Sequence, residues 1–127
     1  MTNIPNKPVL QPGPDHKLVL KHTDPKLEIR AGSVLLSAKA SALELIEHVY
    51  PPVLYIGRDD IDMSLLQRSA HTSWCPYKGE ACYFHVNMDN GDKLENVAWS
   101  YETPFEHIID IKNRLAFYTN HVSFKNI

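Results

Sequence analysis

The nine residues from His71 to Gly79 hold a dense group of chemically useful side chains. The run His-Thr-Ser-Trp-Cys-Pro-Tyr-Lys-Gly contains a thiol, an imidazole, an amine and two aromatic rings. Pro76 and Gly79 favour a turn or loop over a helix interior. Because loops on a rigid scaffold often carry binding and catalytic groups, we expect a functional site in this stretch.

Cys75 is the natural nucleophile candidate in this stretch. Thiols react as thiolates, and a nearby Lys78 or His71 would lower the pKa of the Cys75 thiol. His71 would act as its base if folding brings the two side chains within hydrogen-bond reach. We therefore take Cys75 and His71 as candidate catalytic residues, with no third, orienting residue assigned. The alternative is that Cys75 is a small buried hydrophobe.

A second set of side chains combines cations with aromatic rings. Arg and Lys bind carboxylates or phosphates, and Trp and Tyr form flat apolar walls with one polar group. Together they predict a pocket for a small anionic molecule with a planar or apolar part. The candidate ligand-binding residues are Arg58, Tyr77, Lys78, Trp99 and Tyr101.

The same residues also have a purely structural interpretation. Arg58 has Asp60 and Glu102 as possible ion-pair partners, and Lys78 suits a solvated turn. Trp99 suits a hydrophobic core, since large aromatic side chains bury much apolar area. Both interpretations stay open at the level of the sequence.

Four residues close together in the chain have side chains of the types that bind zinc. His71, Cys75, Cys82 and His85 form the pattern H-x3-C-x6-C-x2-H, and all four are zinc-type ligands. However, the chain has no Cys-x-x-Cys pair, and residues three apart on a straight strand face opposite sides. We therefore expect neither zinc nor another cofactor.

Asp60 and Asp62 are the candidates for a magnesium site. On a strand they share one face and would suit Mg²⁺ beside nucleotide phosphates. No glycine-rich phosphate loop accompanies them, however. Aspartates near the start of a helix also serve as caps, and we favour that structural role.

The bulk composition describes an ordinary globular domain. The chain has 127 residues, a formal net charge of −2 and 43% hydrophobic residues. These values predict one domain with a real core, and they give no electrostatic case for nucleic acid or a membrane surface. The first fourteen residues lack the apolar segment of a signal peptide. We expect a cytoplasmic protein whose two cysteines are reduced.

Short apolar runs predict a set of strands after a proline-rich arm over residues 1–14. The body, residues 15–127, then forms a single domain. Turn signals lie at Asp24-Pro25 and Asn90-Gly91. The expected strands span residues 17–22, 27–30, 33–37, 53–56, 82–86, 97–101, 115–118 and 122–124.

Helical signals are fewer. Residues 38–49 are ambiguous, because their alanines, leucines and glutamates favour a helix by propensity. A short helix over 63–67 would be capped by Asp59 or Asp60. A third begins with Thr103 as its N-cap and Pro104 in the first helical position. Many short strands with one or two short helices predict a mainly β, or α+β, domain.

Five segments in this order and spacing resemble the domain of unknown function 427 family, whose members are mostly bacterial. They are Pro12-Gly-Pro-Asp-His16, Tyr55-Ile-Gly-Arg-Asp-Asp-Ile61, Cys75-Pro-Tyr-Lys-Gly79, Ala98-Trp-Ser-Tyr101 and Leu115-Ala-Phe-Tyr118. The resemblance implies a β-tent architecture, similar to the Mss4-like folds, and no settled activity.

Three functions therefore stay open. The first is a small-molecule-binding protein or an uncharacterised enzyme that uses the candidate catalytic and ligand-binding residues. The second is a non-catalytic protein-interaction module. The third is magnesium-dependent nucleotidyl transfer through Asp60 and Asp62, which a nucleotidyltransferase-like label attached to the family suggests.

Overall fold

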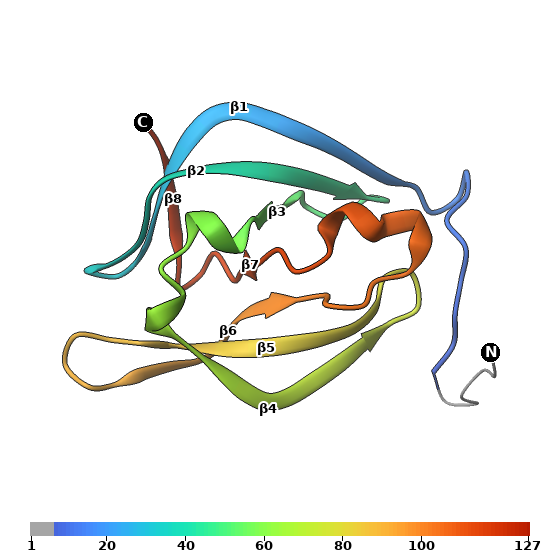
Figure 1. The fold of residues 1–127 in the computed structure, drawn as a ribbon. Coiled ribbons are helices and arrows are strands. Elements are labelled where there is room, and N and C mark those ends of the chain that lie inside the picture. Colours follow the sequence, from blue (N-terminus) through green and yellow to red (C-terminus); the bar gives the residue numbers. More distant parts are fainter. Residues whose placement is uncertain (1–6) are drawn as a thin grey trace.

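Two four-stranded antiparallel sheets face each other in this protein (Figure 1). The computed structural model describes the backbone of residues 7–127 and the side chains of all of these except 24 and 25. The first sheet has the order β3-β2-β1-β8, and the second has the order β4-β5-β6-β7. The strands of the first sheet are β1 (Leu18–Ala31), β2 (Val34–Glu47), β3 (Val53–Ile56) and β8 (Ser123–Asn126). Those of the second are β4 (Leu66–Cys75), β5 (Gly79–Asn87), β6 (Lys93–Ser100) and β7 (Ala116–Phe117).

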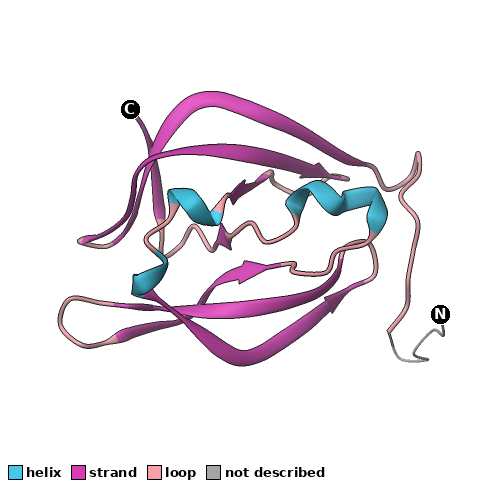
Figure 2. Ribbon diagram, in the orientation of Figure 1, coloured by secondary structure: helices cyan, strands magenta, loops and turns pink. Residues whose placement is uncertain are grey.

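The helical segments of the described chain are short 3₁₀ turns that lie between the sheets in the view of Figure 2. They are η1 (Arg58–Asp60), η2 (Met63–Leu65) and η3 (Glu106–Ile111). An antiparallel bridge between Ile56 and Leu115 connects the edge of β3 to the start of β7. The prediction of a mainly β domain is confirmed.

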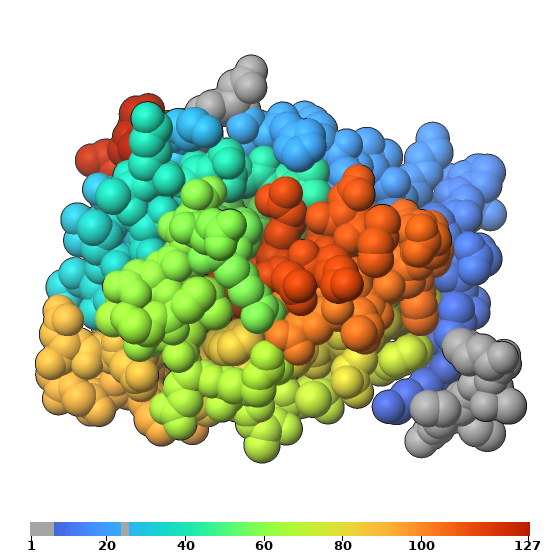
Figure 3. Space-filling view, viewed as in Figure 1, coloured from blue at the N-terminus to red at the C-terminus, as the bar shows by residue number. Residues whose placement is uncertain are grey.

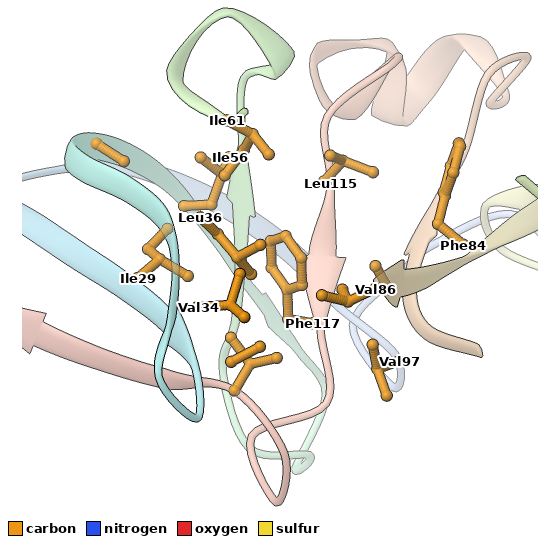
Figure 4. Close-up of a cluster of buried hydrophobic side chains, with 14 of the residues drawn as sticks. Ile29, Val34, Leu36, Ile56, Ile61, Phe84, Val86, Val97, Leu115 and Phe117 are labelled. Carbon is orange, nitrogen blue, oxygen red and sulfur yellow. The ribbon is translucent and has the colours of Figure 1, made fainter. Parts of the chain in front are cut away.

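A dry hydrophobic core fills the space between the sheets (Figure 4). Ile29 and Leu36 come from the first sheet, and Val86, Val97 and Phe117 come from the second. Each is 4% exposed or less. Burying a side chain of this size stabilises a fold by about 1.5–3 kcal/mol, so this layer holds the two sheets together.

The first sheet corrects one expectation about its long strands and resolves one ambiguous segment. The turn expected at Asp24-Pro25 is wrong, because β1 runs through this dipeptide as one strand. Its pairing with β2 shifts in register between Thr23 and Leu27 instead. A proline disturbs a ladder without ending the strand when the strand can bulge there.

Residues 38–49 form strand, not helix, as far as Glu47. This segment pairs with β1 on one side and with β3 on the other. Leu43 and Leu45, two residues apart, are both 2% exposed. Pairing on both edges together with burial therefore outweighs the local helix propensity.

Both expected helix caps are wrong. Asp62, rather than Asp59 or Asp60, caps η2 by accepting a hydrogen bond from the Ser64 amide at 3.2 Å. Thr103 does not cap η3, which begins after Phe105 without a side-chain cap. The Phe105 amide donates to the carbonyl of Lys78 at 3.1 Å, and this bond holds the chain extended just before η3.

The stretch from His71 to Gly79 is only partly a loop. β4 continues to Cys75, and the turn comprises residues 76–78. Gly79 has φ +108°, and a Cβ there would lie 3.4 Å from the carbonyl oxygen of Thr103. Glycine is therefore required where this turn packs against the segment that leads into η3.

The segment before β1 runs along one side of the molecule from the first sheet to the second (Figures 1 and 3). The Leu10 amide donates to the carbonyl of Pro76 at 2.8 Å, and the Trp74 indole donates to the carbonyl of Pro8 at 2.7 Å. The first six residues of the expected arm lie outside the described residues. No helix in the described part of the chain is long and apolar enough to cross a membrane.

Candidate functional site

A cleft of about 230 Å³ opens where β2 and β3 of the first sheet face β5 and β6 of the second. Leu45, Pro51 and Val53 supply apolar lining, and Glu47 and Lys78 supply a charge pair. Most of the remaining wall is aromatic. Its aromatic residues are Tyr50, Tyr55, Tyr83, Trp99, Tyr101 and Tyr118. We call this space the tyrosine cleft.

Strand alternation explains why these aromatic rings meet. Tyr83 on β5 is the direct cross-strand partner of Trp99 on β6, so their side chains share a face. Trp99 and Tyr101 are two residues apart, and this spacing brings Tyr101 to the same side. Phe84, one residue from Tyr83, packs in the central core instead.

Lys78 and Glu47 form a nearly buried ion pair at the cleft. The Lys78 ammonium donates to a Glu47 oxygen, and the two side chains are 9% and 16% exposed. His16 donates from Nε2 to the other Glu47 oxygen at 2.8 Å. Burial acts to raise the pKa of Glu47, but the bonds from Lys78 and His16 outweigh it and hold that pKa below its usual value.

Tyr55 and Tyr101 present buried phenols to the cleft. The residues are 1% and 6% exposed. Burial, reinforced by neighbouring acidic groups, raises the pKa of both hydroxyls, so they stay neutral at physiological pH. Within residues 7–127 the Tyr101 hydroxyl makes no hydrogen bond. A neutral phenol both donates and accepts, and Tyr101 is one of the residues that line the cleft.

Tyr83 and Tyr118 are two further tyrosines that line the cleft. The Tyr83 hydroxyl is 2.9 Å from the Ser73 hydroxyl. Burial and the neighbouring Tyr83 raise the pKa of Tyr118. The Trp99 ring lies 4.6 Å from the Tyr118 ring, tilted by 47°. The walls are therefore flat rings edged with hydroxyl groups, a surface that binds planar or apolar groups.

Cys75 and His71 are not brought together as a nucleophile and base. Cys75 packs against the buried cluster beside the cleft, where Tyr55 and Tyr101 also lie. His71 is exposed, and its ring lies 4.5 Å from the ring of Tyr83. Four residues of extended strand separate the two Cα atoms by about 13 Å. The structure therefore gives no support to direct activation of Cys75 by His71.

Arg58 and Tyr77 also lie away from the tyrosine cleft. Tyr77 stacks on His16 with ring centroids 3.8 Å apart, so it supports His16 behind Glu47. Arg58 bonds Glu102 at 2.9 Å, and Arg68 bonds the same carboxylate at 2.6 Å. The hydrogen bond from Arg68 is the main reason that the pKa of Glu102 is lowered. Of the predicted ligand-binding residues, the cleft thus brings together Lys78, Trp99 and Tyr101.

The zinc-type ligands occupy separate environments. The Cys82 sulfur lies 3.5 Å from the carbonyl oxygen of Ser100, and His85 Nδ1 accepts from the Asn96 amide at 3.0 Å. Burial is the main cause of a raised pKa at the Cys82 thiol. In the described part of the chain no group of three or more His, Cys, Asp or Glu residues is arranged to hold a metal.

The two magnesium candidates are engaged in local hydrogen bonds. The Asp60 carboxylate accepts from the Ser41 amide at 3.3 Å. The Asp62 carboxylate accepts from the amide and the hydroxyl of Ser64. Asp62 therefore has the capping role that we favoured, whereas Asp60 has a structural role of another kind, as a hydrogen-bond partner of β2.

Sequence reasoning missed Glu47, Tyr55, Tyr83 and Tyr118 as site residues. Glu47 lay in the segment with a helical propensity, where its position facing Lys78 could not be inferred. Tyr55 could have been predicted from the sequence, because a tyrosine in an apolar strand needs a hydrogen-bond partner or a polar cavity for its hydroxyl. Tyr83 and Tyr118 acquire their role only through the pairing of distant strands.

Comparison with known proteins identifies the family. The family described as a domain of unknown function (DUF427) matches residues 19–125. Since this match covers most of the chain, the protein belongs to the DUF427 family, as its motifs indicated. No curated protein shows significant similarity to the chain.

Proposed function

We propose that this DUF427 protein binds a small molecule whose neutral, hydrogen-bonding group enters the tyrosine cleft. The observation that carries the proposal is Tyr101, which lines the cleft beside the Lys78–Glu47 pair and whose hydroxyl has no hydrogen-bond partner within residues 7–127. A hydrogen bond to this hydroxyl contributes about 0.5–1.5 kcal/mol net. A ligand that makes this bond gains that energy.

The charges around the cleft favour a neutral group over a simple anion. Lys78 is paired with Glu47, and the lowered pKa of Glu47 keeps this carboxylate ionised near neutral pH. An anion that approaches Lys78 therefore also meets a negative charge. Arg58, the other expected anion-binding residue, is bound to Glu102 outside the cleft. An amide or hydroxyl group suits both members of the ion pair, because it donates and accepts.

Binding without a chemical step is the form of the proposal that the geometry supports. Cys75 borders the cleft but lies far along the strand from His71, so no nucleophile–base pair is assembled there. Asp60 and Asp62 are held in local hydrogen bonds. For these reasons neither covalent catalysis nor nucleotidyl transfer is part of the proposal.

A protein-interaction module is the second candidate function. The surface beside the mouth of the cleft exposes three apolar side chains, Val49, Tyr50 and Tyr118, at 79%, 56% and 44%. Exposed apolar and aromatic residues of this kind are enriched in protein interfaces. On this alternative a partner covers the mouth, and the buried phenols are only structural.

Benzamide and benzoate compare a neutral with an anionic head group, because they share one shape and differ in charge. Trp99 lies in the cleft wall, so its fluorescence reports occupancy; replacing Trp74, the other tryptophan, by phenylalanine leaves Trp99 as the sole reporter. We expect benzamide to bind with a Kd of about 1 mM, as is usual for so small a ligand, and more tightly than benzoate. Tyr101→Phe should weaken benzamide binding by about fivefold to tenfold through loss of one hydrogen bond.

The control is Tyr77→Phe, which makes the same substitution outside the cleft, where Tyr77 stacks on His16. It should leave the affinity unchanged. Failure of benzamide to bind at millimolar concentration, or equal affinity in wild type and Tyr101→Phe, would contradict the proposed function.

A further inference from the structure

A second, larger hollow adjoins the tyrosine cleft. Its volume is about 700 Å³. The residues common to both spaces are Tyr50, Pro51, Val53, Trp99 and Tyr118. We call this hollow the outer groove. Since the two spaces share these residues, they lie side by side.

The outer groove has a different chemical character from the cleft. Beyond the shared walls it is lined by Leu54, Phe117, Val122 and Phe124, together with Pro52, Thr119 and Ser123. Of the described residues that line it, none carries a charge. A surface of this kind binds the apolar part of a ligand through the removal of apolar area from water.

The sizes of the two spaces also indicate that a ligand extends across both. Small-molecule pockets commonly measure about 300–1,000 Å³. The tyrosine cleft, at about 230 Å³, falls just below this range, whereas the outer groove adds about 700 Å³. The cleft alone holds one ring or head group and leaves the apolar groove open to water.

We propose that the ligand is a neutral amphipathic molecule, with its hydrogen-bonding head in the tyrosine cleft and an elongated apolar body in the outer groove. This inference rests on the proposed function and adds the chemical class of the ligand. Trp99 and Tyr118 line both spaces, and their ring centroids lie 4.6 Å apart. In this proposal the apolar body of the ligand contacts these two rings. Val53 and Pro51 line both spaces as well.

A homologous series of 4-alkylbenzamides tests the inference. The shared benzamide head occupies the cleft, and the para chain points along the groove. Titrations of the ethyl, butyl and hexyl members in the Trp74→Phe background should show the affinity rising about threefold to fourfold per methylene until the groove is filled. Benzamide without a chain is the reference.

Thr119→Phe tests where the chain lies. Thr119 is exposed and lines the outer groove but not the cleft. The larger ring should block the groove, so it should abolish the gain with chain length and leave benzamide affinity unchanged. His121→Phe adds the same ring at an exposed position that is not part of the groove lining, and it should keep the full gain.

The outcomes separate this inference from the proposed function. If benzamide binds but a longer chain brings no gain in affinity, the inference is overturned and the proposed function stands. If the gain persists in Thr119→Phe, the chain lies elsewhere and the inference is also overturned. If benzamide itself fails to bind, both proposals fall.

Discussion

Among single residues, Glu47 has a direct influence on the charge of the cleft. This carboxylate is the shared partner of Lys78 in the cleft and of His16 behind it. Breaking a fully buried ion pair costs about 3–5 kcal/mol, and we expect about 1–3 kcal/mol here because Glu47 is 16% exposed. The ion pair therefore both supports the fold and sets the charge of the site.

The lowered pKa of Glu47 predicts a pH dependence of stability. A carboxylate whose folded pKa lies below its unfolded value stabilises the protein above the unfolded pKa, near 4.5. That contribution is lost as the pH falls through the folded value. Glu47→Gln should therefore be less stable than wild type by a constant margin above about pH 5, and the margin should shrink in more acid solution. Urea denaturation of both proteins at several pH values measures it.

Glu44→Gln is the matched control for this experiment. Glu44 lies on the same strand and pairs with Lys21, whose side chain is 61% exposed. An exposed pair contributes little, so this variant should differ from wild type by less than about 1 kcal/mol. A margin for Glu47→Gln that stays constant down to pH 3 would show that Glu47 has no lowered pKa in the folded protein.

At the scale of the elements, the turn between β4 and β5 positions Lys78. The Lys78 amide donates to the carbonyl of Cys75 at 3.2 Å, and the Lys78 carbonyl accepts from Phe105. The backbone of Lys78 is thus held on both sides. Gly79 completes the turn at a positive φ against Thr103.

Gly79→Ala should therefore destabilise the protein by about 1–3 kcal/mol, because a Cβ is strained at φ +108° and approaches the Thr103 carbonyl. Gly57→Ala is the control, since Gly57 has φ −60° and a Cβ there meets no atom within 4 Å. It should change stability by less than about 1 kcal/mol. Equal effects of the two substitutions in thermal unfolding would refute the role given to Gly79.

The sequence predicted some elements well and others poorly for identifiable reasons. The strand predicted over residues 53–56 is confirmed, and its signal was clear because a short apolar run follows two prolines and precedes Gly57. Residues 66–75 carried no strand signal, because most side chains of β4 are polar and only partly buried. The helical propensity of residues 38–49 was overridden by pairing on both edges of β2.

The site shows the same division. Lys78, Trp99 and Tyr101 were predicted from residue type, and all three line the cleft. Arg58 was predicted on the same grounds, but it pairs with Glu102 outside the cleft. Glu102 is one of the two ion-pair partners expected for Arg58 in its structural interpretation. Glu47 and Tyr83 reach the cleft only through contacts between distant strands, and no local pattern encodes such contacts.

In the molecule as a whole, the described part of the N-terminal segment contacts both sheets. Its His16 binds Glu47 and stacks on Tyr77. Leu10 forms a hydrogen bond with Pro76 in the turn after β4, and Pro8 accepts one from Trp74 on β4. The segment thus contacts the cleft-lining residue Glu47 through His16. This arrangement predicts that the segment supports binding without lining the cleft.

Two truncations test this prediction. Removing residues 1–11 keeps His16 and should lower stability while leaving benzamide affinity within about twofold of the full chain. Removing residues 1–17 also removes the His16 bond to Glu47 and should weaken benzamide binding further, by about threefold to tenfold. Equal affinities in the two truncated proteins, each still folded by circular dichroism, would show that His16 does not support the cleft.

We propose that ligand binds in the tyrosine cleft, and not at the surface where Arg58 and Arg68 pair with Glu102. Chemical-shift mapping of the isotope-labelled protein during a titration with 4-butylbenzamide tests it most directly, because each backbone amide and the Trp99 indole report separately. The account predicts saturable shifts at Val53, Lys78, Trp99 and Tyr101, with residues around Arg58 and Arg68 unaffected. Shifts confined to the surroundings of Arg58 and Arg68, or the absence of any saturable shift, would contradict it.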